Sequence, residues 1–207
     1  GSEMCIRDRK IHLAQTRFIS PSKLNVVHNW QNPDHFCVKH PVSKSELFTF
    51  MYLGNLGPLA NLDFVIRTFS LARPKNSRLV IAGSGSMKCE LMNLILDLKT
   101  ENIDFVDVPL GKVGEVQSLA DVFVLPVKKG GALSSVPSKL PAYMFSRKPV
   151  LASIDLDSES SEVITRSQCG MVVNPDNAEE LAAAFCKMRS LDKGSLDKLG
   201  SNGYNYA

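Results

Sequence analysis

A chain of 207 residues with 44% hydrophobic and 22% charged residues is typical of an ordinary globular protein of one or two domains. Its formal net charge is only +3 and its basic residues are scattered, so the clustered basic face of a nucleic-acid-binding protein is not expected. No apolar run reaches the roughly 18 to 20 residues of a membrane-spanning helix, which leaves peripheral contact as the expected form of any membrane association.

The first 46 residues differ in pattern from the rest of the chain. Residues 1–9, "GSEMCIRDR", have neither the apolar centre of a signal peptide nor an amphipathic period, and we interpret them as a cloning or tag remnant. Residues 10–46 contain a weak helical pattern, one short strand and a polar connector. We expect them to be the remnant of a preceding domain and its hinge, so that the main domain comprises residues 47–207.

The spacing of cysteine and histidine predicts neither disulfides nor a metal site. The five cysteines are irregularly spaced and form no C-x-x-C pair, which favours a reducing cytosol. The one cluster of metal-binding residue types in the sequence is His35, Cys37 and His40. A zinc site needs a fourth ligand and the sequence offers no matching second pair, so a surface loop is preferred to a metal site.

From Leu47 onward, short apolar runs alternate with helical patterns, as in consecutive βα units. The predicted strands are residues 47–53, 78–83, 103–108, 121–127, 149–153 and 170–174. The helical patterns cover residues 59–72, 87–100, 114–120, 158–167, 177–190 and 195–207. Together they predict an α/β fold with a doubly wound, Rossmann-like parallel sheet of about six strands. The last helical pattern stops abruptly, so we expect this domain to be truncated at its C-terminus.

Ligands of an open parallel sheet bind beyond the carboxyl ends of its strands, which directs attention to three loops. The first, "YLGNLGPLANLD", follows the first strand and sets Gly54 and Gly57 around the amide of Asn55. Glycines let backbone N–H groups approach a bound group closely, and the amide can donate or accept. Ligand contact is therefore favoured over a plain turn, which needs no such combination.

The second loop, "AGSGSMKCE", carries a G-x-G pattern after a strand. Lys88 stands where the third glycine of a dinucleotide-binding fingerprint belongs, which weakens that interpretation. A structural turn with Ser86 as the cap of the following helix is preferred. A dinucleotide-binding oxidoreductase domain remains the alternative.

The third loop, "GGALSSVPSKLPAYMF", combines a lysine with the start of a helix. Within a helix, proline is tolerated only in the first turn. Pro141 therefore predicts a helix that starts at Ser138, with Ser138 in the capping position and Lys139 as the first helical residue. An anion could then be bound by the N–H groups of that turn, by the hydroxyls of Ser134, Ser135 and Ser138, and by the ammonium of Lys139. We favour this anion site over a solvated loop.

Six segments in register resemble the C-terminal, donor-binding half of retaining glycosyltransferases with the GT-B fold, in family 4 or "glycosyl transferases group 1". The segments are "KLNVVHNWQNPDHF", "YLGNLGPLANLDFVI", "RLVIAGSGSMKCEL", "SLADVFVLPV", "VPSKLPAYMFSRKPVLAS" and "CGMVVNPDNAEELAAAF". The fifth is most similar to a subgroup with the signature V-P-S-K-L-x-E-Y-M, whose members build bacterial capsule, O-antigen and related surface glycans.

The resemblance implies a nucleotide diphosphate sugar as donor, most often linked to uridine, and neither a cofactor nor a metal. It implies a glycan or lipid-linked acceptor, bound through a missing N-terminal half that also holds the acceptor-side catalytic residues. A cytoplasmic location, or the inner face of the membrane, follows from that role. The fragment alone is expected to bind donor weakly and to transfer nothing.

By the same resemblance, the diphosphate lies between the Gly54 to Gly57 loop and the helix start at Ser135 to Lys139, with the base near Pro109 to Lys112. Glu159 could approach the donor, although an acidic residue at a helix start is more simply a capping residue. The implied donor-binding residues are Gly54, Asn55, Gly57, Ser134, Ser135, Val136, Ser138, Lys139 and Glu159.

The chain departs from the family pattern at four positions. Asn55 and Ala60 stand where many members carry an arginine and a lysine, which leaves Lys139 as the best cation. Ser134 and Ala142 replace two glutamates, the second of which grips the ribose hydroxyls in other members. Losing those contacts would cost about 1 to 3 kcal/mol of donor binding. A degenerate, non-catalytic nucleotide-sugar-binding subunit is therefore an alternative.

Overall fold

A computed structural model of the protein describes residues 20–23, 36, 45–134 and 138–207. Its centre is a parallel sheet in the order β3-β2-β1-β4-β5-β6, which confirms the predicted doubly wound α/β fold of six strands. The strands are β1 (Phe48–Leu53), β2 (Ser77–Ala82), β3 (Ile103–Val106), β4 (Val122–Pro126), β5 (Val150–Ser153) and β6 (Gly170–Val173). Five of them lie within a run that the sequence predicts as a strand, and β2 begins one residue before its predicted run, at Ser77. The signal is clear because a strand buried on both faces is continuously apolar.

The helices of the described residues follow the predicted helical patterns, with short additions. Those predicted are α2 (Leu62–Ala72), α3 (Lys88–Leu98), α4 (Val113–Ser118), α6 (Lys139–Phe145), α7 (Glu159–Ser167), α8 (Ala178–Ser190) and α9 (Lys193–Tyr206). The additions are the 3-10 turn η3 (Pro58–Ala60) and the four-residue helix α5 (Gly131–Ser134). A further 3-10 turn, η1 (Pro21–Lys23), lies in the N-terminal segment.

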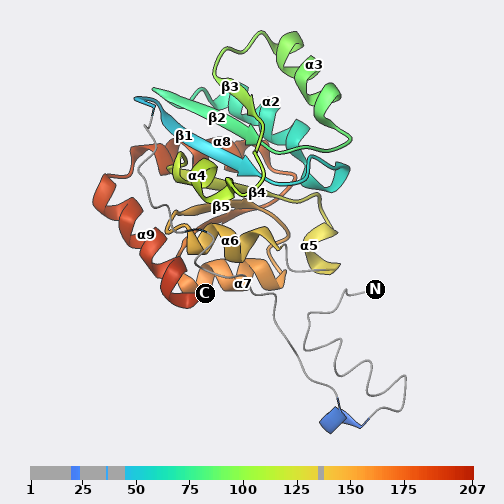
Figure 1. The fold of residues 1–207 in the computed structure, drawn as a ribbon, viewed down its shortest axis with the longest axis vertical. Helices are drawn as coiled ribbons and strands as arrows, with labels where there is room; N and C mark the ends of the chain where they lie inside the picture. Colours follow the sequence, from blue (N-terminus) through green and yellow to red (C-terminus); the bar gives the residue numbers. More distant parts are fainter. Residues whose placement is uncertain (1–19, 24–35, 37–44, 135–137) are drawn as a thin grey trace.

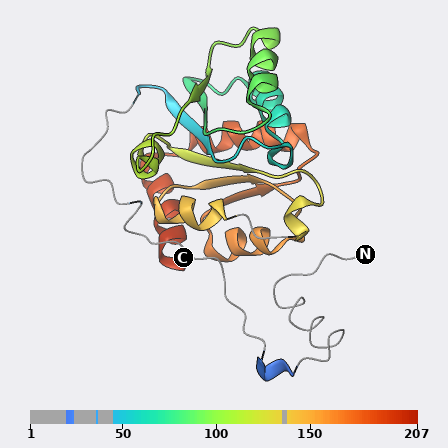
Figure 2. The ribbon, with the colours of Figure 1, turned by 45° about the vertical axis from the view of Figure 1, so that its right-hand side comes forward.

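The sheet lies between two layers of helices, as Figure 1 and the rotated view in Figure 2 show. Helices α2, α3 and α8 cover one face and share a core with it, whereas α4, α6 and α7 cover the other face. Side chains of β1 alternate between these cores, with Phe50 and Tyr52 in the first and Met51 in the second. Helix α9 packs against α6 and α7 at the edge of the second layer.

Three phenylalanines hold the first core together. Phe50 contacts the rings of Phe69 and Phe185 edge to face, with centroids 5.8 Å and 5.0 Å away, and Phe69 and Phe185 make the same contact at 5.1 Å. All three side chains are fully buried. Such pairs contribute about 0.5–1.5 kcal/mol each beyond the burial of their surface, so this cluster fixes α2 and α8 against β1.

Serine and asparagine side chains cap α7 and α8, whereas the predicted start of α6 has no capping side chain. Ser158 caps α7, because its hydroxyl accepts a hydrogen bond of 3.2 Å from the Ser161 N–H, and Asn177 caps α8 in the same way. Helix α6 begins at Lys139 as predicted, but Ser138 has a helical backbone and makes no capping hydrogen bond. A capping side chain needs an extended backbone to reach the N–H groups of the first turn.

The prediction that Ser86 caps α3 is wrong. The helix starts one residue later, with Met87 at the cap position and no capping side chain. The Met87 N–H instead donates to the Leu56 carbonyl oxygen across 2.9 Å, which fixes the start of the helix through the neighbouring loop. A contact between two loops satisfies the N–H group that a local cap would otherwise serve.

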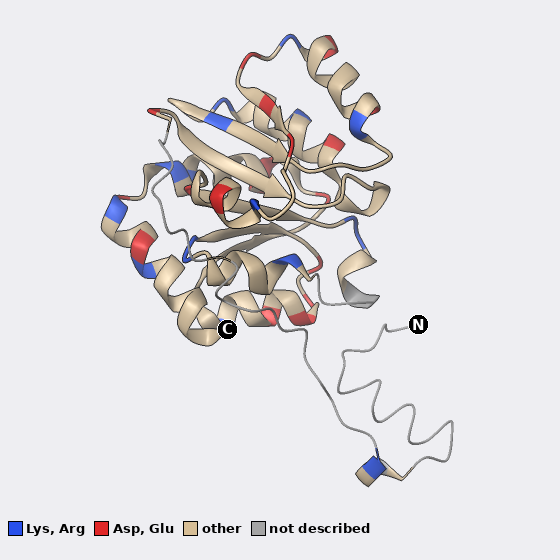
Figure 3. Cartoon of the chain, viewed as in Figure 1, with Lys and Arg blue, Asp and Glu red and all other residues tan. Residues whose placement is uncertain are grey.

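Several predictions fall on residues outside the described ranges. These are the tag remnant at residues 1–9, most of the proposed hinge at residues 10–46, and the cluster of His35, Cys37 and His40. Within the described ranges, no helix is long and apolar enough to cross a membrane, and no group of three or more potential metal ligands occurs. Lysines and arginines are interspersed with acidic residues over the described part of the chain (Figure 3).

Candidate active site

A cavity of about 560 Å³ opens beside the carboxyl end of β1. It lies at the point where the strand order reverses, between β1 and β4, which is where open α/β sheets bind ligands. The end of β1, the loop after β3, helix α4 and helix α6 all contribute to its wall. Its lining residues are Phe36, Leu53, Gly54, Asn55, Gly111, Val113, Gln117, Ser138, Lys139, Ala142 and Tyr143.

Helix α6 supplies one wall through a single face. Lys139, Ala142 and Tyr143 are spaced three and four residues apart, so they lie together on one side of the helix. Pro141 occupies the third position of the helix, where its missing N–H breaks no internal hydrogen bond. The helix can therefore begin immediately beside the end of β1, and its first residue is the lysine.

Lys139 is a partly buried cation in the cavity wall. Its aliphatic chain packs on Gly54 so closely that a Cβ at position 54 would overlap Lys139 Cε. Its Nζ lies 5.7 Å from the centre of the Tyr52 ring, and burial lowers the pKa of the ammonium from its usual value. No carboxylate within the described ranges forms an ion pair with it. The cavity thus holds a positive charge that an anionic ligand would neutralise.

Two buried tyrosines fix the loop on which this lysine rests. The Tyr143 hydroxyl donates to the Leu53 carbonyl oxygen (2.9 Å) and accepts from the Leu53 N–H (3.1 Å), while its ring stacks on Phe123. The Tyr52 hydroxyl donates to the Asn55 carbonyl oxygen across 2.6 Å. Burial raises the pKa of both hydroxyls, so they remain neutral donors near neutral pH. The backbone of residues 53–55 is consequently held in one conformation beside Lys139.

The glycines of the G-x-G pattern serve packing between loops. Gly83 has a φ of +129°, and a Cβ there would overlap the Gly54 carbonyl oxygen. A Cβ on Gly85 would lie 2.5–2.6 Å from backbone atoms of Leu56. This pattern follows β2, one strand away from the reversal of strand order at which a dinucleotide fingerprint belongs. Its position and contacts both favour the structural interpretation over an oxidoreductase domain.

The structure brings four of the predicted site residues to this cavity: Gly54, Asn55, Ser138 and Lys139. Gly57 instead precedes η3, where its carbonyl oxygen accepts from the Ala60 N–H. Glu159 is the first residue of α7, next to the capping Ser158, and does not border the cavity.

The remaining site predictions concern the segment before α6. Ser134 is the last residue of α5, and Ser135 and Val136 lie outside the described residues. The loop after β3, predicted to receive the base, reaches the cavity through Gly111, and Ala142 also lines it.

Sequence reasoning missed five cavity residues, Phe36, Leu53, Val113, Gln117 and Tyr143. Gln117 and Tyr143 are at most 1% exposed, and each places a polar group at a helix position that faces the sheet. A polar residue on an otherwise apolar helix face was the available signal, but only the tertiary structure shows that it borders a cavity.

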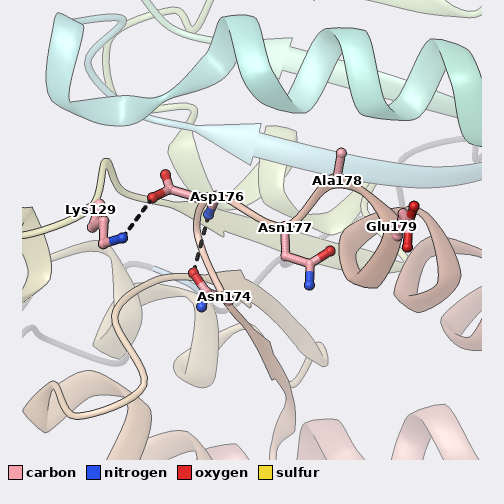
Figure 4. A pocket seen from close by; sticks show the side chains of 6 residues that line it. All are labelled: Lys129, Asn174, Asp176, Asn177, Ala178 and Glu179. Atoms are coloured by element: carbon pink, nitrogen blue, oxygen red, sulfur yellow. Dashed lines mark hydrogen bonds and ion pairs between the residues drawn. The ribbon is translucent and has the colours of Figure 1, made fainter.

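A second cavity of about 410 Å³ lies between the loops after β4 and β6 (Figure 4). Lys129 reaches it but forms a 3.1 Å ion pair with Asp176, and the side chain of Glu179 also lines it. The charge of Lys129 is therefore already compensated, and a further carboxylate is close. A diphosphate would be repelled here, which directs an anionic ligand to the cavity that contains Lys139.

The structures similar to this chain confirm the fold. HepE from Anabaena, solved in complex with UDP and glucose, has a TM-score of 0.71 at 15% identity, covering 96% of this chain and 55% of that one. Sucrose-phosphate synthase from Thermosynechococcus elongatus has the same TM-score at 17% identity, with coverage of 96% and 51%. WaaG, a glycosyltransferase involved in lipopolysaccharide biosynthesis, has a TM-score of 0.62 at 20% identity, with coverage of 78% and 43%.

Two sequence comparisons agree with these structures. "Probable glycosyltransferase WbjE" from Pseudomonas aeruginosa is 23% identical over 148 residues, which are 71% of this chain but only 37% of that protein. The sequence model of the family described as "Glycosyl transferases group 1" matches residues 48–190, nearly all of the sheet and both of its helical layers. The chain belongs to the glycosyl transferases group 1 family.

Proposed function

We propose that this chain is the donor-binding half of a retaining glycosyltransferase whose donor is a nucleotide diphosphate sugar, most consistently a UDP-sugar. The observation that carries the proposal is the charge of Lys139, which pairs with no carboxylate of the described residues and lies in a cavity at the reversal of strand order. The family and the UDP present in the HepE structure support it. No metal is needed if Lys139 and backbone N–H groups balance the diphosphate.

In this proposal, transfer breaks the bond between the anomeric carbon of the sugar and the diphosphate oxygen, which leaves with the electron pair. A new bond forms to an acceptor oxygen, whose proton is released. Lys139 stabilises the negative charge that develops on the leaving diphosphate, because a fixed cation in a partly buried site interacts strongly with it. The acceptor binds to a domain outside this chain, so the chain alone binds donor without transferring sugar.

The acceptor that we propose is a bacterial surface glycan or its lipid-linked precursor. The segment "VPSKLPAYM" resembles the subgroup signature of that class at every fixed position except Ala142, where the signature has a glutamate. The role of WaaG in lipopolysaccharide biosynthesis supports the same class of acceptor. We place the reaction in the cytoplasm, at the inner face of the membrane when the acceptor is lipid-linked.

Calorimetry with the 207-residue chain tests the proposed donor class. We expect UDP to bind with a dissociation constant of about 1 mM or lower, which corresponds to a free energy of binding of about −4 kcal/mol or better. NAD is the matched control, because it also carries a diphosphate but needs a fingerprint loop after β1. Binding of NAD in place of UDP would overturn the proposal in favour of an oxidoreductase domain.

A non-catalytic nucleotide-sugar-binding subunit is the second candidate, and Ala142 is the observation that favours it. Its methyl group lines the cavity but cannot accept a hydrogen bond from a donor hydroxyl. The rate of sugar transfer by the full-length protein, measured with and without Ala142→Glu, separates the two candidates. We expect the unsubstituted protein to transfer sugar. Activity that appears only after Ala142→Glu would instead identify the natural protein as a degenerate transferase.

A further inference from the structure

Gln117 is a buried polar side chain in the wall of the cavity that also contains Lys139. It lies on α4 and is only 1% exposed, yet it borders the cavity. One end of its carboxamide is held by Ser146, whose hydroxyl lies 2.5 Å from Gln117 Oε1. The other end has no hydrogen-bond partner within the described ranges. This end of the carboxamide borders the cavity, so a polar group of a ligand there would give it a hydrogen-bond partner.

The hydrogen bonds of Ser146 determine which end of the amide is available. Its hydroxyl also lies 3.0 Å from the Ala142 carbonyl oxygen, four residues earlier, the usual acceptor for a serine in a helix. A hydroxyl carries one proton and cannot donate to both oxygens. The conflict disappears when the carboxamide is rotated by half a turn, which exchanges the positions of its oxygen and its nitrogen. The Gln117 NH₂ then donates to the Ser146 hydroxyl, and that hydroxyl donates to the Ala142 carbonyl oxygen. The carboxamide oxygen of Gln117 then faces the cavity as an acceptor.

Lys139 begins α6 and Ser146 follows its last residue, so the two residues mark the direction along the helix from the cation toward Gln117. The two residues are seven positions apart on one face of the α6 segment, which corresponds to two helical turns or about 10 Å. A nucleoside diphosphate with its phosphates at Lys139 carries its ribose next along the molecule, toward Ala142 and Ser146. Ala142 presents only a methyl group there, and the Tyr143 hydroxyl is occupied by the Leu53 backbone.

We propose that Gln117 binds a ribose hydroxyl of the nucleotide donor through its carboxamide oxygen, with Ser146 holding the amide in place. This proposal rests on the proposed donor-binding function and adds to it a specificity-determining residue on α4. Gln117 supplies from a neighbouring helix the acceptor that Ala142 lacks. The site consequently selects ribonucleotides over their deoxy counterparts.

The test compares the affinities of UDP, 2′-deoxy-UDP and 3′-deoxy-UDP for the 207-residue chain by calorimetry. The unsubstituted chain should bind UDP about threefold to tenfold more tightly than at least one deoxy nucleotide, the contribution of one neutral hydrogen bond. Gln117→Met, which keeps the length of the side chain, should bring this ratio to about 1. Gln117→Glu restores an acceptor oxygen and should retain the preference.

Each result bears on a separate claim. Two results would contradict the role proposed for Gln117 while the donor class stands. In the first, UDP binds but Gln117→Met leaves the ratio of the affinities for UDP and the deoxy nucleotide unchanged. In the second, the unsubstituted chain binds all three nucleotides equally. If the unsubstituted chain does not bind UDP, the proposed function fails together with this inference. Should Gln117→Met unfold the chain, Ser146→Ala serves instead. It releases the amide from the half-buried end of α6 and should lower the ratio, whereas an unchanged ratio contradicts the proposal.

Discussion

Replacing Lys139 with methionine is expected to weaken UDP binding by about tenfold to a hundredfold, the usual contribution of a hydrogen bond to a charged group. Methionine keeps most of the aliphatic chain that packs on Gly54 and removes only the ammonium. The stability of the chain should therefore change little. Calorimetry of UDP binding, together with thermal unfolding of the same samples, measures both quantities.

The matched control for this substitution is Lys198→Met, which removes the same charge from an exposed position on α9. It should leave UDP binding within about twofold, because α9 contributes no residue to the cavity and salt screens exposed charges. Since burial lowers the pKa of Lys139, the affinity of the unsubstituted chain for UDP should decline as the pH rises toward that lowered pKa. The Lys139→Met variant should lack this decline. If both lysine variants lost affinity for UDP equally, the net charge of the chain would determine binding, and the position of Lys139 would not.

Gly85→Ala is expected to destabilise the fold by about 1–3 kcal/mol or more, the usual cost of overpacking. The added methyl group would meet the Leu56 backbone at 2.5–2.6 Å, and two loops would have to separate. The Leu56 N–H and carbonyl oxygen also hold Ser84 and Met87, so separation would break hydrogen bonds at the start of α3. Urea unfolding of the variant and the unsubstituted chain gives the difference in unfolding free energy.

Gly54→Ala provides a comparison with the opposite expected result. Its methyl group would meet the flexible end of the Lys139 side chain, which can move away at little cost in stability. Displacing Lys139 should weaken UDP binding while the unfolding free energy stays close to that of the unsubstituted chain. If Gly85→Ala left stability unchanged, or if it affected UDP binding alone, the structural role assigned to the G-x-G loop would be wrong.

The strands and the long helices could be predicted from the sequence because their signals are local. A continuous apolar run such as residues 122–127 leaves few alternatives to a buried strand, and Pro141 indicates where α6 begins. The caps were less predictable. Ser86 has the right chemistry, yet the N–H of the next residue is satisfied by Leu56 from another loop, which no local pattern reveals.

The residues that surround the cavity illustrate the same limit. Gly54 and Lys139 are recognisable because a glycine after a strand and a cation at a helix start are chemically suggestive. Gln117 and Tyr143 are not, because their roles depend on partners 29 and 90 positions away along the chain. Four-residue α5 is too short to show a helical period. Long-range contacts therefore determine which polar residues become part of the site.

The location of bound UDP is the most direct test of this account. A crystal structure of the chain grown with UDP should place the diphosphate within hydrogen-bonding distance of Lys139 Nζ, beside Gly54, with the ribose toward Gln117. Diphosphate density in the second cavity, between Lys129 and Asn174, would contradict the assignment of the donor site. So would a nucleotide bound at the start of α3, beside Gly83 and Gly85.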